Sequence, residues 1–497
     1  MSKTNYLLFF FFIYLGAFAQ SLSIKIVDSK NGIPLPYANI KLSNNTDLIS
    51  NDEGVFNLVE EQDLEENILL ISYLGYQSQK ISVKEIKSQN LTIRLTEVTY
   101  NLNEVSVNNS KPDPNTIMQE VKNRLKSNYT AASNSNKRSL FLREGTIFTP
   151  SQINVDINKS TGFSKKQLKE VDREVNSFCT NLKSNPSKKY EDLLCDYYMT
   201  NKPENNCKLD VLKATVIKGD GTATSMEDLQ KKGLSILLKH LDSTKYYRIK
   251  SGLFGSRDTI SFKDTSKKDE AKNSNLINTR SKLSVFFFEQ QFLAGSKFNF
   301  IYNPEIYEYR FNGKLYDEET NDVVYILEFS PRKSKAKYTG KLYISETDYA
   351  VVKCDYKLAE NEIVDGLNLK FLLGIKVQEN IDNGVVLYKK SKNDGVYELQ
   401  YAYEESGQYF YLNRPVKFIE LNKGEKDIFA FDLKFEGNLI NKTELLTISK
   451  SEIAQNTFEN FKEDDFKYLK LKQYDPKIWK NYISIEPLEA MKQYKAL

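Results

Sequence analysis

The chain of 497 residues is long enough for roughly two to four domains, each with its own core. Its 70 lysine and arginine residues nearly balance its 66 aspartate and glutamate residues, so the formal net charge is only +4. This balance does not predict a nucleic acid partner, which would require a broad basic face. The short basic cluster at 331–337 (PRKSKAK) is typical of a solvated loop.

The first residues have the parts of a secretory signal. Lys3 precedes an apolar run at 6–19 (YLLFFFFIYLGAFA), and this run ends in the small-x-small triplet AFA. The run is shorter than the roughly 20 apolar residues that a membrane-spanning helix needs. We therefore predict a signal peptide at 1–19 and export of the chain. The alternative is an uncleaved anchor.

Four cysteines remain in the exported chain. Cys179, Cys195 and Cys207 are close enough in sequence for two of them to form a disulfide, and spacing alone does not say which two. Cys354 lies in an alternating run and is interpreted as a small buried apolar residue. Because no two cysteines form a CxxC pair, we predict neither a zinc site nor a dithiol redox site. We also predict no other metal site and no cofactor.

Residues 20–97 consist of short alternating runs separated by turn residues, a pattern that predicts a β-sandwich of about seven strands. The tetrad at 51–54 (NDEG) is predicted to be a turn, with Gly54 supplying a positive φ. After this turn, Phe56 and Leu58 fall on one face of a strand. We expect this face to be core.

The same residues resemble a known family. The runs GIPLPYANI (32–40), NDEGVFNL (51–58) and ISYLGY (71–76) resemble the carboxypeptidase-regulatory-like domain, which is common in exported proteins of Bacteroidota. The run NLNEVSV (101–107) resembles the segment that often leads out of this domain. The resemblance implies a transthyretin-like sandwich with a structural or interaction role, in the periplasm or at the outer membrane.

The family name does not imply a peptidase activity for this chain. A zinc carboxypeptidase site takes two histidines and a carboxylate as metal ligands. This chain has one histidine, His240, which lies near the predicted end of a helix and needs no catalytic explanation. We therefore predict that the chain is not a metallocarboxypeptidase, and we assign no catalytic residue.

After a predicted linker at 98–115, residues 116–262 are predicted to be a mixed segment that contains helices. One helix is expected to begin after Asp113, which suits an N-cap because Pro114 follows it. Further helical patterns occupy 163–178 and begin again near residue 225. The polar stretch at 263–283 is predicted to be a loop.

Residues 284–497 are predicted to form an antiparallel β-rich domain with a helical tail at its C-terminus. From about residue 296 the apolar residues recur with a period of two, and every odd position of 367–377 is apolar. This alternation predicts long antiparallel strands in a curved sheet with one apolar and one wet face. We therefore expect a mainly β chain with an N-terminal sandwich, a mixed helical segment and a C-terminal curved sheet.

The apolar face of this sheet must be covered, and the sequence leaves three alternatives. The 31 tyrosines and 29 phenylalanines can fill a core, line a groove for a hydrophobic ligand, or face lipid in a barrel. The candidate ligand-binding residues on this face are Tyr309, Phe371, Phe429 and Phe431. A curled sheet of this kind resembles the half-barrel of periplasmic lipoprotein carriers. The tail at 475–488 (DPKIWKNYISIEPL) resembles the ending of envelope proteins that begin with the same module.

These observations favour an exported, non-catalytic envelope protein with a β-sandwich interaction module and a β-rich scaffold or binding domain. Its expected partners are other envelope or outer-membrane proteins. The main alternative is a periplasmic carrier or sensor of a hydrophobic ligand. A hydrolase that uses only carboxylates is a further alternative, with the acidic runs at 317–319 and 464–465 as candidates.

Overall fold

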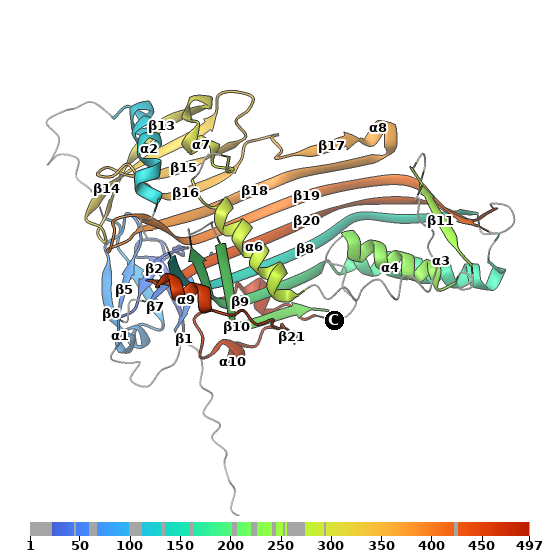
Figure 1. Cartoon of the computed structure of the whole chain (residues 1–497), viewed down its shortest axis with the longest axis horizontal. Helices are drawn as coiled ribbons and strands as arrows, with labels where there is room; N and C mark the ends of the chain where they lie inside the picture. Colours follow the sequence, from blue (N-terminus) through green and yellow to red (C-terminus); the bar gives the residue numbers. More distant parts are fainter. Residues whose placement is uncertain are drawn as a thin grey trace, which may run out of the picture.

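In the computed structural model, two small sheets and one large sheet carry most of the chain (Figure 1). The predicted signal peptide, the run 101–107 and residues 263–273 of the predicted loop lie outside the described residues. The structure describes residues 22–43, 46–58, 67–98, 112–130, 135–159, 161, 163–200, 206–219, 226–240, 245–251, 254–255, 274–292, 295–421 and 426–496.

The N-terminal part is a sandwich of a three-stranded sheet, in the order β4-β1-β7, and a four-stranded sheet, in the order β3-β2-β5-β6. Phe56 and Leu58 are buried between the sheets, which confirms the predicted seven-stranded sandwich and its core face. The elements are β1 (Leu22–Asp28), β2 (Asn39–Lys41), β3 (Asp47–Ile49), β4 (Val55–Leu58), β5 (Ile68–Ser72), β6 (Gln79–Ser82), α1 (Val83–Ser88) and β7 (Thr92–Leu95).

The turn before β4 depends on Gly54. Its φ is +72°, and a Cβ added there would lie 2.8 Å from the carbonyl oxygen of Ile26. Both the backbone conformation and the space therefore favour glycine, as the sequence predicts.

The large sheet has 14 strands among the described residues, and long antiparallel strands dominate it. Its curvature is plain in Figure 1, so the predicted long-stranded, curved sheet is confirmed. The parallel pair is β10 with β21. The strands after residue 300 are β13 (Tyr307–Asp317), β14 (Asp322–Pro331), β15 (Tyr338–Ser345), β16 (Val351–Leu358), β17 (Gly366–Leu369), β18 (Ile375–Lys390), β19 (Tyr397–Glu420), β20 (Lys426–Glu452) and β21 (Leu469–Leu471).

The segment 116–262 supplies strands to this same sheet. Its strand β8 pairs with β20 along most of the length of both strands, and β9 and β10 follow next to β8. The helices and strands of this region are α2 (Pro114–Tyr129), β8 (Ser135–Lys159), α3 (Lys165–Ser184), β9 (Ser187–Thr200), β10 (Asn206–Lys218), α4 (Met226–Leu238), β11 (Tyr247–Ser251) and β12 (Phe254–Gly255). The N-cap predicted at Asp113 is present, because Asp113 accepts hydrogen bonds from Asn115 and Thr116 at the start of α2.

Helices cover one face of the large sheet, which we call the inner face. Near the sandwich, α2 and α6 (Asn275–Glu289) pack on it together with the short α7 (Asn299–Tyr302), and at the far end α3 and α4 pack on it. The opposite, outer face carries the sandwich. Alternate strand residues therefore serve two cores: Leu140, Leu142, Leu193 and Leu445 face the helices, whereas Phe141, Leu194, Tyr401 and Leu446 face the sandwich side.

Two local expectations from the sequence are wrong. Residues 275–283 of the predicted loop form the first part of α6, because Leu276, Leu283 and Phe287 fall on one buried face and Ser274 caps the helix. The alternating run 367–377 does not form one strand, because Gly374 at φ +66° ends a helical turn, α8 (Lys370–Leu373), between β17 and β18.

Among the described residues, the tail after β20 contains strand β21 and three short helices, α9 (Gln455–Asn460), α10 (Pro476–Trp479) and α11 (Glu489–Lys492). A 3-10 turn, η3 (Pro304–Ile306), precedes β13.

Candidate functional site

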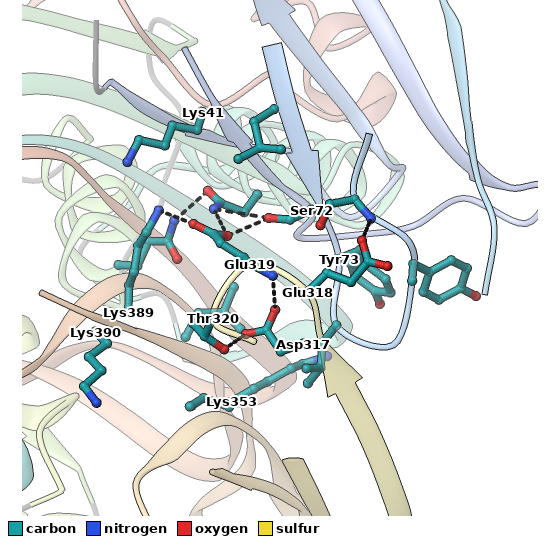
Figure 2. A pocket seen from close by; sticks show the side chains of 18 of the residues that line it. Lys41, Ser72, Tyr73, Asp317, Glu318, Glu319, Thr320, Lys353, Lys389 and Lys390 are labelled. Atoms are coloured by element: carbon teal, nitrogen blue, oxygen red, sulfur yellow. Dashed lines mark hydrogen bonds and ion pairs between the residues drawn. The ribbon is translucent and has the colours of Figure 1, made fainter. Parts of the chain in front are cut away.

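A partly buried polar network joins the sandwich to the large sheet (Figure 2). Glu319, in the turn between β13 and β14, accepts hydrogen bonds from Asn39 Nδ2 at 2.9 Å and from Ser72 Oγ at 2.7 Å. Lys389 Nζ on β18 lies 3.1 Å from Glu319 and 3.0 Å from Asp47 on β3. Glu319 and Lys389 of the large sheet therefore contact three polar residues of the sandwich, and these charge-assisted contacts fix the position of the sandwich on the sheet.

The charges in this network stabilise each other. Burial acts to raise the pKa of Glu319, but the charge of Lys389 and the hydrogen bonds from Ser72 and Asn39 lower it overall. Burial likewise acts to lower the pKa of Lys389, and the carboxylates of Glu319 and Asp47 raise it overall. Both groups are therefore held in their charged forms near neutral pH.

Beside this network lies an open cavity of about 1560 Å³ between the sandwich and the sheet. The sandwich contributes β2, β5 and the loop after β5, and the sheet contributes the β13–β14 turn, β16 and the end of β18. The described part of the lining contains more basic than acidic side chains. These are Lys41, Lys80, Lys353, Lys389, Lys390 and Lys392, against Glu97, Asp317, Glu318 and Glu319.

The acidic side chains of the lining are largely engaged. Glu318 accepts a hydrogen bond from the Ser78 amide at 2.8 Å, and Asp317 accepts one from Thr320 Oγ1 at 2.7 Å. The pKa of Lys41 is lowered by burial first and then by the charge of Lys389, although Asp47 opposes this shift. Lys389 and Lys392 thus act against the charge of Lys41, whereas Lys353, Lys389 and Lys390 each have a carboxylate partner. An anionic group placed beside Lys41 and Lys392 would relieve this repulsion.

The C-terminal tail fastens the sandwich to the outer face. Trp479 packs edge-on against Phe141 of β8 with ring centroids 5.4 Å apart. Asn51 Oδ1 accepts hydrogen bonds from two amides of its own turn, and Asn51 Nδ2 donates to the carbonyl oxygen of Glu486 at 3.0 Å. Glu486 also accepts a hydrogen bond from Asn57. The NDEG turn therefore shapes the sandwich and also binds the tail.

The structure does not bring the four predicted ligand-binding aromatics together. Tyr309 is buried in the core beneath α2 and α6, and Phe429 and Phe431 are buried in the separate core beneath α3. Phe371 is fully exposed on α8. These four side chains do not line one cavity, because α8 interrupts the strand and because helices fill the inner face.

The three cysteines considered for a disulfide are free thiols, as is Cys354, so the predicted disulfide does not form. Cys179 lies on α3 in the far core, whereas Cys195 and Cys207 pack in the core nearer the sandwich. Cys207 Sγ instead lies 3.1 Å from Ser284 Oγ. His240, at the end of α4, pairs with Glu174 at 3.2 Å.

The two acidic runs considered for hydrolysis have structural partners. Asp317 shapes the β13–β14 turn, and burial raises its pKa. Asp465 accepts hydrogen bonds from the Leu276 amide and Ser274 at the start of α6, and these bonds lower its pKa. Asp317 and Glu319 do line the cavity, but each is committed to neighbouring protein groups.

The described residues lack two kinds of feature. They contain no group of three or more histidine, cysteine, aspartate or glutamate side chains placed to hold a metal ion. Among the helices that the structure describes, none is long and apolar enough to span a bilayer.

Comparison with known proteins identifies the class of the N-terminal part. Residues 24–107 match the family model of the CarboxypepD_reg-like domain, so the chain contains a carboxypeptidase-regulatory-like β domain. No curated protein matches the chain. Among solved structures, the MucA/MucB complex of Pseudomonas aeruginosa is similar at 8% identity and a TM-score of 0.15, covering 68% of this chain and 99% of that one. A TM-score this low supports no inference about fold or function.

Sequence reasoning missed the polar network that joins the sandwich to the large sheet. Asn39, Ser72 and Lys389 are ordinary strand residues in the sequence, and Glu319 belongs to an acidic turn. One signal was available in the sequence: consecutive positions of β8 and β9 are apolar, so that apolar side chains lie on both faces of these strands. This pattern indicates a sheet that is covered on both faces.

Proposed function

We propose that the chain is an exported, non-catalytic envelope protein that binds an anionic segment of an envelope partner in the cavity between its sandwich and its large sheet. The observation that carries this proposal is the lysine-rich wall of the cavity, where Lys41 lies near Lys389 and Lys392. A carboxylate or phosphate group would gain charge-assisted hydrogen bonds there.

The predicted signal peptide supports the exported location. The location also agrees with the resemblance of the N-terminal module to exported proteins of Bacteroidota, in which such a module has a structural or interaction role. The non-catalytic assignment is supported by the partners of the cavity residues, because Ser72, Asp317 and Glu319 are hydrogen-bonded to protein groups that hold the fold.

The experiment is crosslinking in the native cell envelope, followed by mild extraction and identification of the proteins that co-purify. A charge reversal, Lys41→Glu with Lys392→Glu, should reduce recovery of the specific partner at least about tenfold, since two favourable charges become repulsive. Lys165→Glu with Lys166→Glu makes the same charge change on the exposed surface of α3, and we expect it to leave recovery unchanged.

Two results would contradict the proposal. One is a partner recovered equally with both pairs of variants, and the other is the absence of any stable partner. The alternative of a carrier for a hydrophobic ligand draws no support from the placement of Tyr309, Phe371, Phe429 and Phe431. A carboxylate hydrolase would require Asp317 or Glu319 to leave its present hydrogen bonds.

A further inference from the structure

The helical turn α8, between β17 and β18, lies at the end of the large sheet opposite the sandwich (Figure 1). Phe371 is 105% exposed, Leu372 76% and Leu367 51%. We call residues 366–375 the apolar tip. Large apolar side chains exposed together, rather than singly, usually mark a binding surface.

Backbone hydrogen bonds hold the turn of the apolar tip. The Gly374 amide donates to the Lys370 carbonyl oxygen at 3.0 Å, and the Gly374 carbonyl oxygen accepts from the Asn413 amide at 2.8 Å. A Cβ at residue 374 would lie 2.1 Å from the carbonyl oxygen of Asn413, so β19 approaches this glycine closely. The exposed side chains are therefore presented by a fixed turn.

Directly behind the apolar tip, cations and tyrosines share the outer face of the sheet. Lys370 Nζ lies 4.0 Å from the ring centre of Tyr411, and Lys376 Nζ lies 5.4 Å from that of Tyr409. Tyrosines and lysines placed next to an apolar insertion are typical of the water–lipid interface, where the aliphatic stems stay in the apolar layer and the charges reach the headgroups.

The cations beside the apolar tip are Lys370 and Lys376, which flank Phe371 and Leu372 in the chain. Glu436, which pairs with Tyr411, accepts a hydrogen bond from Tyr409, and the paired carboxylates Asp432 and Asp156 follow beyond Lys434. Lysines that flank an apolar tip complement an anionic membrane surface.

The shape also favours lipid over a protein partner. Protein interfaces concentrate their binding energy in packed, water-excluded pockets. A single helical turn that projects from a strand end offers little area to a folded partner, whereas a bilayer surrounds a projecting side chain on all sides. The 16 residues of β18 also separate the apolar tip from Lys389 by roughly 50 Å of strand.

We propose that the apolar tip inserts into the surface of an anionic lipid bilayer, with Phe371 and Leu372 in the acyl region and Lys370 and Lys376 at the headgroups. This inference is independent of what occupies the cavity. The sandwich and the lysine-rich cavity would then face away from the membrane, and both sites could be occupied at the same time.

The test is flotation of the purified chain with vesicles of phosphatidylcholine alone and of phosphatidylcholine mixed with phosphatidylglycerol. The double variant Phe371→Ser with Leu372→Ser should lower the partition coefficient for mixed vesicles at least about tenfold, because two apolar side chains no longer leave water. The matched control is Val285→Ser with Phe288→Ser, two exposed apolar residues of α6 that should leave the coefficient unchanged.

A second pair of variants tests the charges. Lys370→Gln with Lys376→Gln should remove most of the preference for mixed vesicles and keep the weaker binding to phosphatidylcholine. Equal binding by the wild type and the serine variant would overturn the proposal, as would no binding of the wild type to either vesicle. A wild-type dimer that the serine variant converts to a monomer would also overturn it, because a second copy would then cover the apolar tip. The Lys41→Glu, Lys392→Glu variant should bind vesicles normally, so this proposal and the proposed function can fail separately.

Discussion

At the scale of single residues, the contact between the sandwich and the large sheet depends on charges that are partly buried together. Glu319 joins Asn39, Ser72 and Lys389, which come from three strands in two parts of the molecule. Removing one partner of a buried, hydrogen-bonded charge leaves the others unsatisfied, and that cost usually exceeds the net gain from the pair itself. The register of the sandwich on the sheet therefore depends on this carboxylate.

We predict that Glu319→Gln lowers the free energy of unfolding by about 1–3 kcal/mol at pH 7. The folded pKa of Glu319 lies below its usual value of 4.5, so its stabilisation is present above pH 4.5 and is lost as the pH falls through the folded pKa. The difference from the wild type should therefore shrink below pH 4.5. Urea unfolding at pH 7 and at decreasing pH measures this difference.

The matched control is Glu318→Gln, which removes the same charge from the neighbouring position. Its amide oxygen can still accept the hydrogen bond from Ser78, so we expect a change within about 0.5 kcal/mol. Equal losses for the two variants, or a Glu319→Gln effect that does not depend on pH, would show that Glu319 does not act through its buried charge.

At the scale of elements, the C-terminal tail holds the sandwich against the large sheet. The short helices α10 and α11 have little intrinsic stability, and their positions depend on what they pack against. Trp479 and Ile485 lie in a core with Ile49 of the sandwich and with Phe141 of the sheet. Glu53 of the NDEG turn accepts a hydrogen bond from the Glu489 amide at 3.2 Å, at the start of α11. One segment thus contacts both larger parts.

We predict that Trp479→Ala lowers the free energy of unfolding by about 3–5 kcal/mol, because a large buried side chain is lost and a cavity remains. Circular dichroism should follow urea unfolding, since the variant has no tryptophan left. Hydrogen exchange should also accelerate in β3 and in the Asn51 turn, which pack against the tail.

Lys470→Ala, at an exposed position of β21, is the control and should change stability by no more than about 0.5 kcal/mol. If hydrogen exchange in β3 stayed at the wild-type rate in the Trp479→Ala variant, the tail would not stabilise the position of the sandwich.

At the scale of the whole molecule, the large sheet unites segments that the sequence separates. Strand β20 lies between β19 and β8, so the segment 116–262 supplies a neighbour to the longest strand of the sheet. Helices cover its inner face, and the sandwich and tail cover part of its outer face. This arrangement places the cavity at one end and the apolar tip at the other.

We predict that a fragment of residues 284–497 does not fold alone, because it leaves the 27-residue strand β20 as an exposed edge. Size-exclusion chromatography should show aggregates, whereas the chain from residue 22 onward should elute as a folded species with a β-type circular dichroism spectrum. A monomeric, folded fragment would support the domain boundary predicted at residue 284.

Local physics made much of the fold predictable. Period-two alternation indicated the long strands, and the turn chemistry of Asn51 and Gly54 indicated the hairpin before β4. The cap at Asp113 also appears as expected. The errors have local causes as well. The polar composition around residues 275–283 concealed the buried face of helix α6. The run 367–377 looked like one strand, but Gly374 ends a helical turn there and separates β17 from β18.

The sequence by itself determined the mainly β class, the N-terminal sandwich and its family, because these depend on periodicity and turn residues close together in the chain. Only the tertiary structure decided how the sandwich, the C-terminal tail and the large sheet contact one another. Asn39 and Glu319 lie 280 positions apart, and Asn51 and Glu486 lie 435 apart, yet each pair is hydrogen-bonded. Contacts over such separations depend on how strands order themselves in a sheet, and no local pattern of residues encodes that order.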